Sequence, residues 1–146
     1  MNHPDTTRAV AIYLFDKVEL VDFAGPFKVF STALRVRVGQ QPDAAAPFDV
    51  FTVADTQRPV RARGGLRVLP HYDFKSHLPV NVLIIPGGIV SDELQREQVI
   101  NWIAHCARSA LITASVCTGK SRAARWKASD NALGRYRRFA RHVSQC

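Results

Sequence analysis

Cys117 ends an apolar run within residues 111–119, LITASVCTG, and is the residue of this stretch best suited to chemistry. A thiol acts as a nucleophile in its thiolate form, and it is well exposed where a buried strand turns sharply into a helix. Thr118 and Gly119 fit such a turn, which is called a nucleophile elbow. A cysteine at the end of a buried strand is also common as a small core residue. Other residues must decide between these two interpretations.

Two acids follow the apolar run 8–15 and are candidates for proton transfer, namely Glu19 and Asp22. An ionised carboxylate beside a thiol raises the pKa of the thiol, whereas a protonated one can donate a hydrogen bond to the thiolate or pass a proton to substrate. The simpler interpretations are a solvated loop charge for Glu19 and a helix cap for Asp22.

Gly87 and Gly88 follow the apolar run 80–85. We expect this pair to contribute its backbone to an oxyanion or substrate site, because N–H groups at Gly88 and Thr118 can stabilise a developing negative charge. A glycine pair after a strand can equally be only a tight turn.

The apolar patterns predict the elements that must position these residues. Strands are expected at 8–15, 48–54, 80–85 and 111–116, helices at 22–38 and from Ser91 or Asp92 onward, a hairpin at 60–68, and a short helix or turn at 72–78. This alternation indicates an α/β sandwich with a mainly parallel sheet. Ligands bind beyond the carboxyl ends of the strands in such sheets, where all the candidates would converge.

The composition limits the class of protein. A chain of 146 residues with 47% hydrophobic and 22% charged residues is expected to form one globular domain. No apolar run is long enough to span a bilayer, and the N-terminus carries no signal-type block, so we expect neither membrane attachment nor secretion. Three cysteines without metal-ligand spacing fit a reducing cytoplasm. His71, His77 and His105 lack partners at metal-binding spacing, and we expect no metal and no organic cofactor.

The formal net charge of +8 would normally indicate an anionic partner such as nucleic acid. The charge is unevenly distributed, however, because residues 1–117 carry twelve Lys or Arg and eleven Asp or Glu, a net of +1. Residues 118–146 carry eight Lys or Arg and a single acid, Asp130, a net of +7. We therefore expect a nearly neutral domain without specific nucleic-acid binding, followed by an atypical basic tail.

Four segments, taken in order, resemble successive motifs of the ThiJ/PfpI superfamily: VELVDFAGPFKVF, VRARGGLRVLP, VLIIPGGI and ASVCTGK. The resemblance covers residues 8–119 and implies the class I glutamine amidotransferase-like, flavodoxin-like sandwich. The subgroup that looks nearest contains isonitrile hydratases and the ligand-binding domains of AraC-type transcription regulators. The superfamily pattern implies that Cys117 is the elbow nucleophile. It also selects Asp22 over Glu19 as the acidic partner, because the superfamily acid precedes the helix proline, here Pro26, by four positions.

The resemblance breaks after residue 119. In the superfamily an apolar helix and further strands follow, whereas residues 120–128 read KSRAARWKA, and unpaired charges of this kind are costly to bury. We therefore divide the chain into an N-terminal part of a ThiJ/PfpI-like domain, 1–119, and a tail, 120–146. A one-base shift of the reading frame permits codons for the superfamily's T-T-H-W motif in this tail. The hypothesis is that the tail is out of frame, and the nucleotide sequence tests it.

The resemblance implies a reaction in which Cys117 attacks an electrophilic carbon, with hydration of an isonitrile to an N-substituted formamide as the expected example. Asp22 would manage the proton, and the backbone near Gly88 and Thr118 would steady the intermediate. A small molecule is the expected partner, and homodimers are common in the superfamily. One alternative is a small-molecule-sensing domain related to AraC-type regulators. Another is an inactive fragment of low stability, with an exposed sheet edge and apolar face.

Overall fold

The fold is known for residues 6–40 and 45–117, which the computed structural model describes. The elements along the chain are β1 (Arg8–Tyr13), α1 (Leu20–Gln40), β2 (Phe48–Ala54), β3 (Val60–Arg61), β4 (Arg67–Val68), β5 (Tyr72–Asp73), β6 (Val82–Ile85), the 3₁₀ helix η1 (Glu93–Gln95), α2 (Glu97–Ser109) and β7 (Ile112–Ser115).

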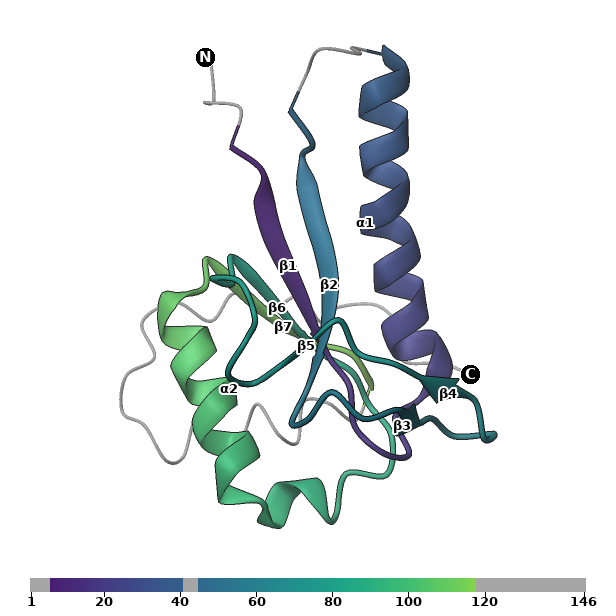
Figure 1. The fold of residues 1–146 in the computed structure, drawn as a ribbon, viewed down its shortest axis with the longest axis vertical. Helices are drawn as coiled ribbons and strands as arrows, with labels where there is room; N and C mark the ends of the chain where they lie inside the picture. Colours follow the sequence, from purple (N-terminus) through teal and green to yellow (C-terminus); the bar gives the residue numbers. More distant parts are fainter. Residues whose placement is uncertain (1–5, 41–44, 118–146) are drawn as a thin grey trace.

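Five strands form one parallel sheet in the order β5-β2-β1-β6-β7 (Figure 1). The chain passes from β1 to β2 on one side and later returns to β6 on the other side of β1. The strand order therefore reverses between β1 and β6, and α/β sheets bind ligands at the carboxyl ends beside such a reversal. The predicted α/β, flavodoxin-like sandwich with a mainly parallel sheet is confirmed.

The two long helices pack on opposite faces of the sheet (Figure 1). On the α1 side, the rings of Phe30 and Phe48 meet edge to face with centroids 4.8 Å apart. On the α2 side, the ring of Trp102 lies 5.6 Å from that of Tyr13 on β1. Apolar side chains of the central strands fill both interfaces, as the continuous apolar runs predicted.

The first helix differs from its prediction at both ends. It was expected at 22–38 and runs from Leu20 to Gln40, so Asp22 lies in its first turn and not at its start. Pro26 was expected in the first turn but is the seventh residue of α1. Since proline has no N–H, it cannot donate the helical hydrogen bond to the carbonyl of Asp22 four residues before it.

The second helix begins later than expected. Asp92 makes no side-chain capping hydrogen bond, and η1 separates it from α2, which begins at Glu97. The predicted apolar face is confirmed for Val99, Ile103 and Cys106, which are buried.

The segment 72–78, expected to form a short helix or turn, contains strand β5 at the edge of the sheet. Tyr72 and Asp73 pair in parallel with the last two residues of β2. The predicted hairpin at 60–68 is confirmed as an antiparallel pair of β3 and β4, with positive φ angles at Gly64 and Gly65 in its turn.

The remaining predictions on the C-terminal part concern residues outside the described ones. Thr118 and the tail 120–146 belong to this group, and their predicted roles stay predictions. Among residues 6–40 and 45–117, no helix is long and apolar enough to cross a membrane.

A buried polar network ties η1 to β1 and β2 under α2. The hydroxyl of Tyr13 donates to Oε2 of Glu93 at 2.6 Å, and Glu93 is only 7% exposed. Arg96 donates to Oε1 of Glu93 at 3.2 Å and also pairs with Asp55. A buried carboxylate needs such partners, because an unpaired charge in the interior is costly.

We expect Tyr13→Phe to lower the free energy of unfolding by about 1–3 kcal/mol, because it leaves the buried Glu93 carboxylate without one hydrogen bond. Urea unfolding followed by tryptophan fluorescence measures the change. Tyr72→Phe is the matched control, since the Tyr72 hydroxyl makes no hydrogen bond to the part of the chain that the structure describes. Equal stability of the two variants would contradict the role given to Tyr13.

Candidate active site at the carboxyl end of the sheet

Cys117 leaves the sheet two residues after β7 with a left-handed backbone. The N–H of Val116 still donates to the carbonyl of Ile85 at 3.0 Å, which extends the β6–β7 ladder by one step. Cys117 then has a φ of +53° and is exposed to solvent. A positive φ is strained for a residue with a side chain, and such strain is concentrated at functional sites.

Gly87 brings an acidic side chain to the strand beside Cys117. Ile85 and Ser115 are the last partners in the β6–β7 register, and Gly87 and Cys117 each lie two residues beyond them. The N–H of Gly87 donates to Oδ2 of Asp22 at 3.1 Å. The Asp22 carboxylate is thereby held at the carboxyl end of β6, next to the strand that ends in the cysteine.

Gly88 lies against the loop that follows β1. Val18 and Gly88 form an antiparallel bridge, and the N–H of Ile89 donates to the carbonyl of Lys17 at 3.1 Å. Gly88 has a φ of +144°, and a Cβ atom there would lie 2.4 Å from the oxygen of Lys17 and 2.9 Å from the Cα of Val18. Only glycine fits this position, since both neighbours are backbone atoms.

Glu19 forms an exposed ion pair with an arginine of the hairpin, and 38% of its side chain remains open to solvent. Its Oε2 accepts from Nη1 of Arg63 at 3.0 Å, and its own N–H donates to the carbonyl of Gly87 at 2.9 Å. No sequence pattern indicates this pairing, because the two side chains are 44 residues apart.

Four of the five candidate site residues lie at one end of the sheet, as predicted. The structure places Asp22, Gly87, Gly88 and Cys117 on the segments that follow β1, β6 and β7. Thr118, the fifth candidate, is outside the described residues. In this arrangement the Gly87 N–H serves to hold Asp22.

Cys106, by contrast, is a structural thiol. It lies on the buried face of α2 at 2% exposure, and desolvation raises the pKa of its thiol to about 11. It therefore stays protonated at neutral pH, and a neutral thiol is a poor nucleophile.

The two described histidines with side-chain contacts also have structural partners. Nδ1 of His71 lies 2.8 Å from Oγ1 of Thr52, and Nε2 of His77 accepts from Nε1 of Trp102 at 2.9 Å. Within residues 6–40 and 45–117, no three His, Cys, Asp or Glu side chains gather to form a metal site.

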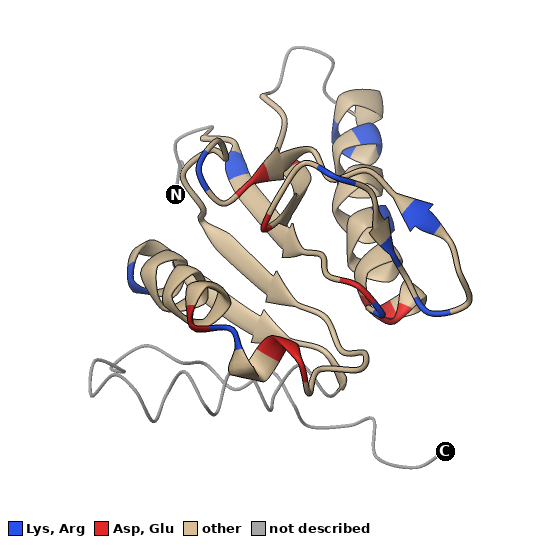
Figure 2. Cartoon of the chain, turned by 60° about the horizontal axis from the view of Figure 1, so that its bottom comes forward, with Lys and Arg blue, Asp and Glu red and all other residues tan. Residues whose placement is uncertain are grey.

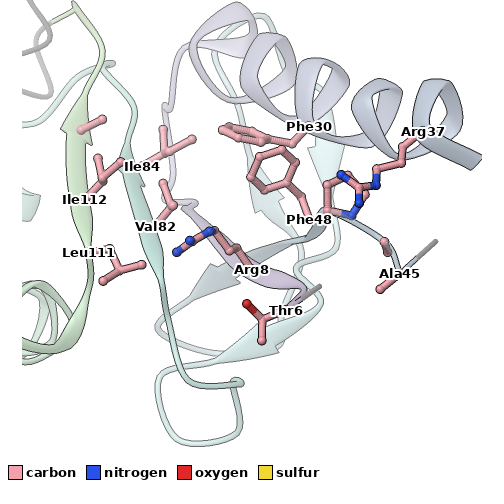
Figure 3. A pocket seen from close by; sticks show the side chains of 13 residues that line it. Thr6, Arg8, Phe30, Arg37, Ala45, Phe48, Val82, Ile84, Leu111 and Ile112 are labelled. Carbon is pink, nitrogen blue, oxygen red and sulfur yellow. The ribbon is translucent and has the colours of Figure 1, made fainter. Parts of the chain in front are cut away.

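A cavity of about 610 Å³ lies at the opposite end of the strands (Figure 3). Its lining includes Arg8 and Phe48 from the starts of β1 and β2, Ile112 from the start of β7, and Phe30 from α1. Val82, Ile84 and Ala114 continue the lining along the face of β6 and β7. None of the four described candidate site residues lines the cavity.

The sequence pattern of the DJ-1/PfpI family matches residues 8–133, which is most of the chain. The chain belongs to the DJ-1/PfpI family. The match continues past residue 119, where we expected the resemblance to end. The expected superfamily is confirmed.

Several family members resemble this chain over part of their length. Isonitrile hydratase from Pseudomonas putida is 29% identical over 111 residues, which is 75% of this chain and 43% of that enzyme. The structure of a ThiJ/PfpI family protein from Pseudomonas syringae superimposes with a TM-score of 0.70 at 19% identity, over 83% of this chain and 46% of that one. A protein from Vibrio parahaemolyticus, described as a proposed transcriptional regulator, gives 0.65 at 19% identity over 84% and 62%. The chain thus spans less than half of the first two relatives.

We expect Gly88→Ala to lower the free energy of unfolding by about 2–4 kcal/mol, because the new methyl group meets backbone atoms of the 17–19 loop. Gly25→Ala is the control. A Cβ atom at Gly25 has no neighbour within 4 Å outside its own helix, and alanine in a helix interior adds up to about 1 kcal/mol. Urea unfolding curves measure both. A Gly88→Ala protein as stable as the wild type would show that the contact is not tight.

We expect Cys106 to make the fold less stable as pH rises from about 8.5 toward 11. The unfolded thiol ionises near 8.5 while the folded thiol keeps its proton, so the unfolded state is favoured by up to about 1.4 kcal/mol per pH unit in this window. Unfolding of the wild type and of Cys106→Ala at pH 7.5, 9 and 10 measures the difference between their slopes. Parallel slopes would contradict a buried protonated thiol.

Proposed function

We propose that this chain carries the nucleophile-bearing part of a DJ-1/PfpI domain that hydrates small electrophiles such as isonitriles. The observation that carries the proposal is the Asp22–Gly87 hydrogen bond, which holds a carboxylate at the carboxyl end of β6, the strand that pairs with the one leading to Cys117. The similarity to isonitrile hydratase points to the same chemistry. The substrate is a small molecule, and we place the reaction in the cytoplasm, where thiols stay reduced.

The chemistry needs one nucleophile and one group that moves protons. The Cys117 sulfur forms a bond to the terminal carbon of the isonitrile, and that carbon takes a proton, which gives a thioimidate. Water then adds across the C=N bond. The carbon–sulfur bond breaks, and the products are an N-substituted formamide and the free thiol. No oxidant or reductant is consumed, and Asp22 is the group that gives and takes the proton.

The backbone supports this assignment at two points. The positive φ of Cys117 is the conformation that a nucleophile elbow requires, and the residue is exposed to solvent. Gly88 lies beside the strand-order reversal, where a backbone N–H can stabilise negative charge on the intermediate. Thr118 is proposed as the second donor.

A second candidate function is small-molecule sensing without turnover. The structural likeness to the Vibrio parahaemolyticus protein proposed to regulate transcription favours it. In that case the site at Cys117 binds its ligand without converting it, and the assembled form is a homodimer as in many sensing domains.

The test is the rate of formamide production from a simple alkyl isonitrile. We expect Cys117→Ser to lower the rate by at least about 10²-fold and Asp22→Asn by about 10- to 10³-fold, since a nucleophile and a proton donor each contribute on this scale. Cys106→Ser is the matched control and should retain activity. Equal rates for the wild type and Cys117→Ser would remove this cysteine from the mechanism. Saturable isonitrile binding without product would favour the sensing function.

A further inference from the structure

The hairpin β3–β4 is fastened to the loop that follows β1. The N–H of Lys17 donates to the carbonyl of Arg61 at 2.7 Å, and the N–H of Arg63 donates to the carbonyl of Val18 at 3.0 Å. Oδ1 of Asp16 accepts from the N–H of Arg61 at 2.9 Å. The hairpin therefore pairs with this loop through hydrogen bonds, as a neighbouring strand would. The hairpin lies outside the main sheet, and its residues Val60 and Ala62 are also buried in the hydrophobic core.

The same loop is fastened on its other side to the candidate site. Glu19 donates its N–H to the carbonyl of Gly87, and the Val18–Gly88 bridge lies beside it. The side chain of Glu19 pairs with Arg63, and its backbone N–H donates to the carbonyl of Gly87. The N–H of Gly87 in turn donates to Asp22. A series of contacts therefore runs from the hairpin to Gly87 and Asp22.

Charge is concentrated at this end of the sheet, where the base of α1 and the hairpin bring acidic and basic positions together (Figure 2). The charged side chains of the loop, the start of α1, the hairpin and the segment facing Lys17 are Asp16, Lys17, Glu19, Asp22, Arg61, Arg63, Arg67 and Asp92. Lys17 and Asp92 lie 3.9 Å apart on the exposed surface. Asp16 and Asp22 accept backbone N–H groups. Among these contacts, only Arg63 brings a full positive charge to Glu19.

We propose that Arg63 is a positioning residue for the Cys117 site. Its guanidinium holds Glu19 in place and balances the charge of that carboxylate, so that Glu19 adds no second unbalanced negative charge to that of Asp22 at this end of the sheet. This inference rests on the proposed role of Cys117 as the reactive thiol. Without Arg63, an unbalanced carboxylate at the rim of the site lowers the thiolate fraction, because like charges disfavour each other.

The experiment measures the rate at which iodoacetamide modifies Cys117 in the full chain at pH 7.5, resolved by peptide mass spectrometry. Cys106 in the same sample reports unfolding, because it is buried and reacts only when the fold opens. The variants are Arg63→Ala, Arg63→Lys, Glu19→Gln and the double variant Arg63→Ala with Glu19→Gln. Arg58→Ala is the matched control, since Arg58 is exposed and precedes the same hairpin.

We expect Arg63→Ala to slow Cys117 modification about threefold, as a change of half a pKa unit does. Arg63→Lys and the double variant should return to the wild-type rate, because one restores the positive charge and the other removes the negative one. Arg58→Ala should leave the rate unchanged.

The proposal is overturned by a wild-type rate in Arg63→Ala, by a double variant as slow as Arg63→Ala, or by modification of Cys106 in Arg63→Ala, which would mean a general loss of structure. Failure of the positioning role can be distinguished from failure of the proposed hydratase function. A chain that shows the charge effect on Cys117 but forms no formamide supports the positioning role and removes the hydratase activity.

Discussion

The backbone contact between Gly88 and the 17–19 loop is the constraint on which the site depends. It closes the space where the strand order reverses between β1 and β6, and it admits no side chain because a Cβ atom would lie 2.4 Å from the Lys17 oxygen. The next residue on one side, Gly87, then holds Asp22 and Glu19 by its N–H and carbonyl. One tight approach of two loops therefore positions two acids at once.

The two cysteines of the described region differ in chemistry because they differ in burial. Cys106 lies on the buried face of α2, where burial raises the pKa of its thiol and keeps it neutral. Cys117 stands beyond the end of β7 with a strained backbone and open access to solvent. The same side chain is thus a core residue in one place and a candidate nucleophile in the other, because desolvation disfavours the thiolate.

The chain belongs to the DJ-1/PfpI family, whose fold its described part adopts. It spans 43% of the length of the isonitrile hydratase that it resembles. The described part contains the three strand ends that carry the proposed nucleophile and its acid. The face of β6 and β7 on the α1 side carries Val82, Ile84 and Ile112 into an open cavity (Figure 3). Apolar surface of this kind lowers solubility unless it is covered.

The sequence by itself determined the parallel α/β fold, because apolar runs and helical spacing are local properties of the chain. Residue type and place named Cys117 as the candidate nucleophile, the family resemblance selected Asp22, and both roles stay predictions. It misplaced the starts of α1 and α2, since Pro26 within a helix and the buried Glu93 are tolerated only through tertiary contacts. Only the folded structure decided that Arg63 binds Glu19 and that Gly88 lies against Lys17. These contacts join residues more than forty positions apart, and the path of the chain between them, which sets the distance, leaves no pattern in the sequence.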